Sequence, residues 1–141
     1  MTFAIEARDG PLPAADAGVV DQGLGDFNDA AAPLHEVRAI GCFARDEQGR
    51  VVGGAVGRSW GEACELQQLW VDETQRGSGL GSQLMRAFEQ RGREHGCRVF
   101  YLETFSFQAP DFYRRFGYEV VHANAAFPHG IRKLLMERRE P

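Results

Sequence analysis

The sequence has no long apolar run, no basic start and few cysteines. No stretch approaches the roughly 20 apolar residues of a membrane-spanning helix, so we expect no membrane partner. The first ten residues, MTFAIEARDG, lack the basic and then apolar pattern of a secretory signal. Cys42, Cys64 and Cys97 are odd in number and far apart, which predicts buried free thiols rather than a disulfide framework. Together these absences predict a cytoplasmic protein.

The net charge and the spacing of the histidines argue against two further classes, nucleic-acid-binding and metal-binding proteins. The net charge of -4 and pI near 5.6 disfavour nucleic acid, which requires a basic face, and fit a small or cationic partner better. The four histidines show no metal-binding spacing such as H-x-x-x-H, so we expect no metal. A chain of 141 residues, with 43% hydrophobic and 26% charged residues, is typical of a single globular domain over 1–141.

Hydrophobic periodicity predicts the order of the elements. TFAIEA (2–7) alternates and predicts a first strand, and one or two short helices are expected around 15–28. The later elements are a hairpin over 39–60, a third antiparallel strand over 63–71, a helix from about 80, a strand over 98–105, a short helix over 109–117 and two closing strands over 118–123 and 132–138. This order predicts a mixed α/β (α+β) fold with a largely antiparallel sheet flanked by helices.

A glycine-rich stretch, TQRGSGLGSQLMRAFEQRG (74–92), begins the central helix. Taken alone, such a stretch is more often a turn before a helix. A P-loop would need lysine after its second glycine, and the dinucleotide pattern would need a glycine where Ser82 stands. What remains is an anion nest, in which backbone N–H groups and Arg76 bind a pyrophosphate at the start of the helix.

Two blocks of the sequence resemble the GNAT superfamily of N-acetyltransferases. Residues 76–81, RGSGLG, fit the acetyl-CoA motif Arg/Gln-x-x-Gly-x-Gly/Ala of that family. The segment APDFYRRFGYEVV is similar to its Ala-x-x-x-Tyr-x-x-x-Gly-Phe/Tyr block, with Ala109 and Tyr113 in register. The resemblance is strong over 63–121 and loose before 39, and ETFSFQAPDFY suggests a bacterial subgroup.

The resemblance implies a GNAT-like fold whose sheet splays between 63–71 and 98–105 to admit the cofactor. It implies acetyl-CoA as co-substrate, no metal, and a capacity to form a homodimer. Ser106 stands where many members have asparagine. The implied cofactor-binding residues are Leu69, Trp70, Val71, Arg76, Gly77, Ser78, Gly79, Leu80, Gly81, Ser106, Ala109 and Tyr113.

The chemistry of acetyl transfer requires an acid, a base and an oxyanion donor. Tyr113 is the candidate acid, because a phenol stays protonated beside a thiolate; alternatively its ring only packs under the sheet. Glu65 is the candidate base and Glu103 its rival, and either glutamate could instead be a solvated strand residue. A backbone N–H near Trp70 or Val71 could serve the oxyanion.

The sequence therefore predicts direct transfer of acetyl to a primary amine through a tetrahedral intermediate. The acceptor would be a small cationic amine or a protein amino group. The alternative is a non-catalytic acyl-CoA-binding, sensing or interaction module on the same fold. Four aromatic residues could line an acceptor pocket or belong to the core: Trp60, Trp70, Phe105 and Phe107.

Overall fold

The computed structural model describes residues 2–141, which fall into two compact units, one ending at His35 and the other formed by Glu36–Pro141. In the first unit a single helix, α1 (Ala14–Ala31), replaces the one or two short helices predicted around 15–28. None of its residues is buried. A short 3-10 turn, η1 (Leu34–Glu36), precedes the sheet. The expectation of one domain over 1–141 stays a prediction.

The predicted strand over 2–7 is wrong, because residues 2–9 have no regular secondary structure. A strand exists only where its backbone groups pair with a neighbour, and the described residues show no such pairing for 2–7. Phe3 and Ile5 are 75% and 92% exposed, so the alternating pattern there faces no core.

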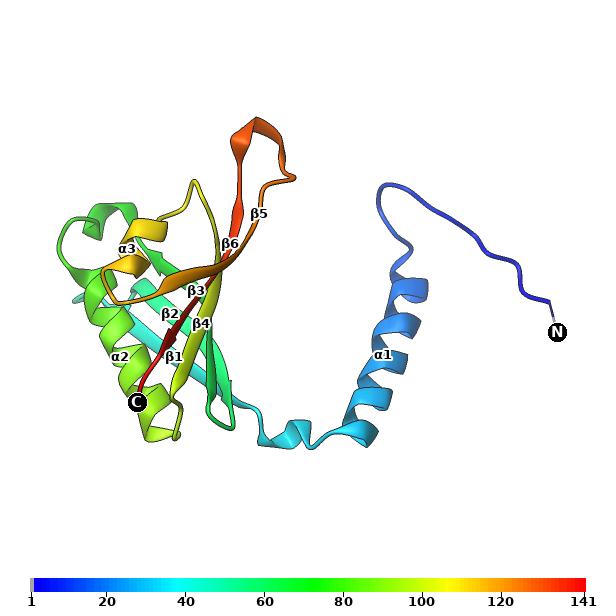
Figure 1. The fold of residues 1–141 in the computed structure, drawn as a ribbon, viewed down its shortest axis with the longest axis horizontal. Helices are drawn as coiled ribbons and strands as arrows, with labels where there is room; N and C mark the ends of the chain where they lie inside the picture. The colour runs from blue at the N-terminus through cyan, green and yellow to red at the C-terminus, as the bar shows by residue number, and fades with distance from the viewer. Residues whose placement is uncertain (1) are drawn as a thin grey trace. The chain divides into compact units, whose positions relative to one another are not determined.

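A six-stranded sheet dominates the second unit, with the order β1-β2-β3-β4-β6-β5 (Figure 1). Only the β3–β4 pair is parallel, which confirms the mixed, largely antiparallel sheet. The strands are β1 (Arg38–Arg45), β2 (Val51–Trp60), β3 (Ala63–Val71), β4 (Val99–Phe105), β5 (Glu119–Asn124) and β6 (Lys133–Arg139). The remaining elements are η2 (Glu73–Gln75), α2 (Leu80–Glu94), α3 (Pro110–Arg114) and η3 (Pro128–Gly130).

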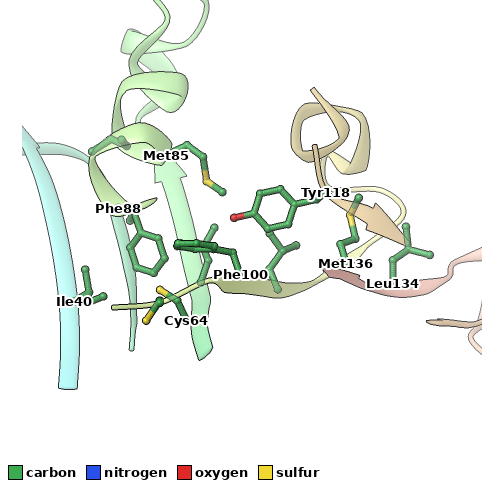
Figure 2. Close-up of a cluster of buried hydrophobic side chains, with 13 residues drawn as sticks. Ile40, Cys64, Met85, Phe88, Phe100, Tyr118, Leu134 and Met136 are labelled. Carbon is green, nitrogen blue, oxygen red and sulfur yellow. The ribbon is translucent and has the colours of Figure 1, made fainter. Parts of the chain in front are cut away.

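The core lies between α2 and the sheet. Met85 and Phe88 on the apolar face of α2 are fully buried, and Figure 2 shows Met85 above Phe100 of β4 and Phe88 beside it. Tyr118, from the second resemblance block, is also buried, and its hydroxyl donates to the Glu89 carboxylate at 2.9 Å. Because Glu89 belongs to α2, this bond ties the helix to the strand that follows Tyr118.

A close backbone approach fixes Gly57 on β2. A Cβ at this position would lie 1.9 Å from the backbone oxygen of Glu65 and 2.7 Å from the Phe88 ring. Real Cβ atoms do not come this close to backbone oxygen, so only glycine fits between β3 and α2.

A β-bulge lies beside this contact. Val56 pairs with Gln68 and Gly57 pairs with Leu66, so Gln67 is an extra residue on β3. The parallel pairing of β3 with β4 ends at the same level, at Leu66 and Leu102. Because a bulge bends and twists its strand, β3 leaves β4 beyond Leu66. This is the splay that the sequence predicted between the two strands.

Candidate active-site cleft

The diverging ends of β3 and β4 form one wall of a cleft of about 930 Å³. Its other walls are the turn before α2, the first turn of α2 and helix α3. The lining residues are Gln67, Gln68, Leu69, Trp70, Val71, Gln75, Arg76, Gly77, Gly79, Leu80, Gly81, Ser82, Glu103, Thr104, Gln108, Ala109, Phe112, Tyr113 and Arg115. The structure thus brings together most residues that the two sequence blocks predicted.

The glycines of the turn have different roles. Gly77 and Gly79 have φ of 80° and 83°, a left-handed conformation that favours glycine. Gly81 lies inside α2, and a Cβ there would be 3.6 Å from the Phe112 ring, an ordinary contact. The turn therefore needs the first two glycines, whereas the third leaves open the space at the cleft.

The N-terminus of α2 can accept an anion. Gly79 is the N-cap of α2 and has no side chain that could bond to the first backbone N–H groups of the helix. Gly79, Leu80 and Gly81 line the cleft, so these N–H groups are available to an anion there. Arg76 also lines the cleft, and its Nε donates to the Val71 oxygen at 3.2 Å. Ser78 lies outside the lining, and its hydroxyl donates to the Gln75 oxygen at 2.6 Å, which braces the turn.

Tyr113 faces the cleft from α3. Its ring packs against the hydrophobic core, edge-on to Tyr118 with centroids 6.3 Å apart. Burial raises the pKa of Tyr113 above the ordinary value of a phenol. The ring thus packs against the core, and the residue also lines the cleft, where the acid role stays a prediction.

The two candidate glutamates lie in different surroundings. Glu65 precedes the bulge, lies outside the cleft lining and accepts a bond from Arg58 Nε at 3.0 Å. Glu103 follows the end of the β3–β4 pairing, lines the cleft and is 52% exposed, with Lys133 Nζ at 3.3 Å. The neighbouring Thr104 is buried on the opposite face of β4, so the cleft is lined from both faces of the sheet.

Ser106 is also outside the cleft lining. Its hydroxyl accepts from the Arg132 backbone N–H at 2.9 Å, which ties the turn after β4 to the start of β6. Gln108 lines the cleft instead, and its Oε1 accepts from Phe105 N at 2.7 Å and Thr104 Oγ1 at 3.1 Å. Gln108 belongs to the segment ETFSFQAPDFY, but the sequence analysis gave it no place at the cleft.

Arg115 is a second lining residue that the sequence analysis missed. Its guanidinium lies 5.6 Å from the centroid of the Phe112 ring. The second resemblance block contains this arginine, but its motif leaves the position open. The glycines and the tyrosine that define the two motifs therefore locate the cleft, but the motifs do not indicate that Arg115 lines it.

The described cysteines offer no competing nucleophile. Cys64 and Cys97 are buried free thiols and Cys42 is half-buried, and burial raises the pKa of Cys64 to about 12. A thiol of that kind is a poor nucleophile. Within residues 2–141 no group of three or more histidine, cysteine or acidic side chains could hold a metal ion. The described helices include none long and apolar enough to cross a membrane.

Fold and cleft together define an acyltransferase of the GNAT type, and the comparisons agree. The sequence model of the acetyltransferase (GNAT) family matches residues 12–118, so the chain belongs to this family. The chain is 39% identical over 108 residues to blasticidin-S acetyltransferase of Streptomyces morookaense, covering 74% of this chain and 79% of that one.

Solved structures show the same fold. An acetyltransferase of Bacillus cereus superposes with a TM-score of 0.75 at 27% identity, over 94% of this chain and 97% of that chain. An aminoglycoside 6'-N-acetyltransferase complexed with coenzyme A has a TM-score of 0.64 at 19% identity, over 72% and 73%.

Proposed function

We propose that the protein is an acetyl-CoA-dependent N-acetyltransferase that transfers acetyl directly to a primary amine of a small cationic molecule. One observation carries the proposal: a single cleft joins the uncapped N-terminus of α2 to Tyr113 and Glu103. The name of one relative, blasticidin-S acetyltransferase, favours a small acceptor over a protein amino group.

The cofactor would lie along the diverging half of β3. The N–H groups between Gly77 and Ser82 would bind the pyrophosphate, with Arg76 adding charge. Beyond Leu66 the edge of β3 that faces β4 has lost its strand partner, so the backbone of Leu69–Val71 would pair with the pantetheine amides. Ala109 at the N-cap of α3 would contact the same arm, whereas Ser78 and Ser106 would act only by bracing turns.

The chemistry follows from groups at the cleft. A neutral amine attacks the thioester carbon, and a backbone N–H of Trp70 or Val71 would stabilise the oxyanion of the tetrahedral intermediate. Tyr113 would donate its proton to the leaving thiolate when the intermediate collapses. Glu103 would take the proton of the amine, directly or through water, because it lines the cleft and Glu65 does not.

Thiol release from acetyl-CoA, measured against a panel of small amines, tests the function. We expect release that depends on the amine, with an acetylated product of the corresponding mass. If acetyl-CoA binds tightly and no amine or protein acceptor releases thiol, the chain is a non-catalytic acyl-CoA-binding module, the alternative that the sequence left open.

The two glutamates provide a matched pair of variants. Glu103→Gln keeps the size of the side chain and removes the base, so we expect kcat/KM at pH 7 to fall about 10²-fold. Glu65→Gln should change kcat/KM less than threefold and should only weaken the bond to Arg58. Steady-state kinetics on both variants make the comparison. Equal losses, or a larger loss for Glu65→Gln, would return the base assignment to Glu65.

Gly81→Leu tests the anion site. The first atom of the new side chain fits, and leucine favours the helix, so we expect little change in melting temperature. The rest of the side chain would enter the cleft and weaken acetyl-CoA binding at least about tenfold, which corresponds to about 1.4 kcal/mol. Titration calorimetry and thermal unfolding measure the two effects.

Gly25→Leu on α1 is the matched control for this change. It is the same substitution in a helix with open space around it. It should leave acetyl-CoA binding unchanged. Unaltered binding in Gly81→Leu would show that the cofactor does not pass this glycine.

A further inference from the structure

Three phenylalanines gather where β4 ends. Phe105 is the last residue of β4, Phe107 lies in the next turn, and Phe127 precedes η3. The Phe105 and Phe107 rings stack at 5.4 Å between centroids, and Phe127 meets Phe105 edge-on at 5.5 Å. We call this group the aromatic shelf. In Figure 1 the end of β4 and the β5–β6 turn lie at the same end of the sheet as the start of α2.

The shelf is held in place but is not part of the core. Phe107 is 66% exposed, and none of the three rings belongs to the buried cluster. Ser106 fixes the turn through two bonds to Arg132, one from its backbone N–H at 2.8 Å and one to its hydroxyl at 2.9 Å. An exposed aromatic ring on an anchored turn is pre-organised for binding, because little conformational entropy is lost when a ligand covers it.

The shelf continues the face of β4 that carries Glu103. Phe105 is two residues beyond Glu103, so both side chains leave the same face of the strand about 7 Å apart. Lys133 connects them, with Nζ 3.3 Å from the Glu103 carboxylate and 5.8 Å from the Phe105 centroid. Glu103 lines the cleft and the three phenylalanines do not, so the shelf adjoins the cleft on the side of Glu103.

We infer that the aromatic shelf binds a flat ring of the acceptor. The substrate class is then a primary amine joined to an aromatic or heteroaromatic ring by a spacer of at least about 7 Å, because Phe107 lies beyond Phe105 as seen from Glu103. The ammonium is complementary in charge to Glu103, whose carboxylate it would share with Lys133, and the ring stacks on the exposed face of Phe107. The inference rests on the proposed function, because it requires the amine to meet acetyl-CoA beside Glu103.

Matched amines test the shelf. We expect 4-phenylbutylamine to have a kcat/KM about 3- to 10-fold above that of its saturated counterpart, 4-cyclohexylbutylamine, because only the aromatic ring stacks. Phe107→Ala should remove this preference by raising KM for 4-phenylbutylamine and leaving kcat nearly unchanged. Phe43→Ala is the control, since Phe43 is 57% exposed on β1, which two strands separate from β4.

Calorimetric titration of 4-phenylbutylamine into the CoA-saturated protein separates the two proposals. Weaker binding to Phe107→Ala than to the wild type and Phe43→Ala supports the shelf, whether or not turnover occurs. Equal binding by the three proteins, or equal use of the aromatic and saturated amines, overturns the shelf and leaves the acetyltransferase proposal intact. Shelf-dependent binding without thiol release from any amine overturns the proposed function alone. Circular dichroism confirms that the variants are folded.

Discussion

Tyr113→Phe is expected to lower kcat about 10²-fold and to leave the free energy of unfolding nearly unchanged. The variant keeps the ring that packs against the core and removes only the hydroxyl at the cleft. Without that proton donor the thiolate must leave unassisted, and a general acid typically contributes 10²–10⁴ in rate. Because burial raises the pKa of Tyr113, the wild-type hydroxyl stays protonated at neutral pH. Thiol release at saturating amine measures the loss.

Tyr118→Phe should have the opposite pair of effects, a lower stability and a nearly unchanged kcat. Its hydroxyl donates to buried Glu89, so its removal leaves a carboxylate with one partner fewer and should cost about 1–3 kcal/mol of stability. Its effect on kcat should be small, because Tyr118 lies outside the cleft lining. An unchanged kcat in Tyr113→Phe would refute the acid role and leave the packing role alone.

Gly57→Ala is expected to destabilise the fold by at least about 3 kcal/mol, an effect of the size that severe overpacking produces. The added methyl group would meet the Glu65 backbone oxygen at 1.9 Å, and backbone cannot rotate away as a side chain can. The strand β2 must then separate from β3 or from Phe88. Urea unfolding monitored by circular dichroism measures the free energy of unfolding.

Gly54→Ala on the same strand is the control for this effect. Its nearest neighbour would be the Phe43 ring at 3.3 Å, an exposed side chain that can move. We expect a change below about 1 kcal/mol, because alanine also reduces the freedom of the unfolded chain. Similar losses at the two positions would mean that the β2–β3 contact adapts more easily than its geometry suggests.

Most of the sheet could be predicted from local patterns. The strand over 63–71 agrees with β3 residue for residue, and α2 begins at residue 80, where the helix was predicted to begin. The alternation of apolar and polar residues over 2–7 predicted a strand that the structure lacks. Such alternation shows only which side chains a strand would bury if it formed. Whether a partner edge exists depends on tertiary structure.

The residues of the candidate site could likewise be predicted only in part. The motif residues from Arg76 to Tyr113 located the cleft, since their spacing is local. Which of Glu65 and Glu103 lines the cleft could not be read from local sequence, because it depends on where two strands that are distant in sequence stop pairing. Nor could the sequence show that Ser106 bonds to Arg132, a residue 26 positions later.

The extra residue at Gln67 also changes which positions of β3 face inward. Before it the inward side chains are Cys64 and Leu66, at even positions, and after it they are Leu69 and Val71, at odd positions. The segment ACELQQLWV is therefore two short alternating patterns that are out of phase by one residue. A strand with one continuous phase could pair with β4 along its whole length and would leave no opening between them. The phase break itself thus marks, in the linear sequence, the residue at which the cleft begins.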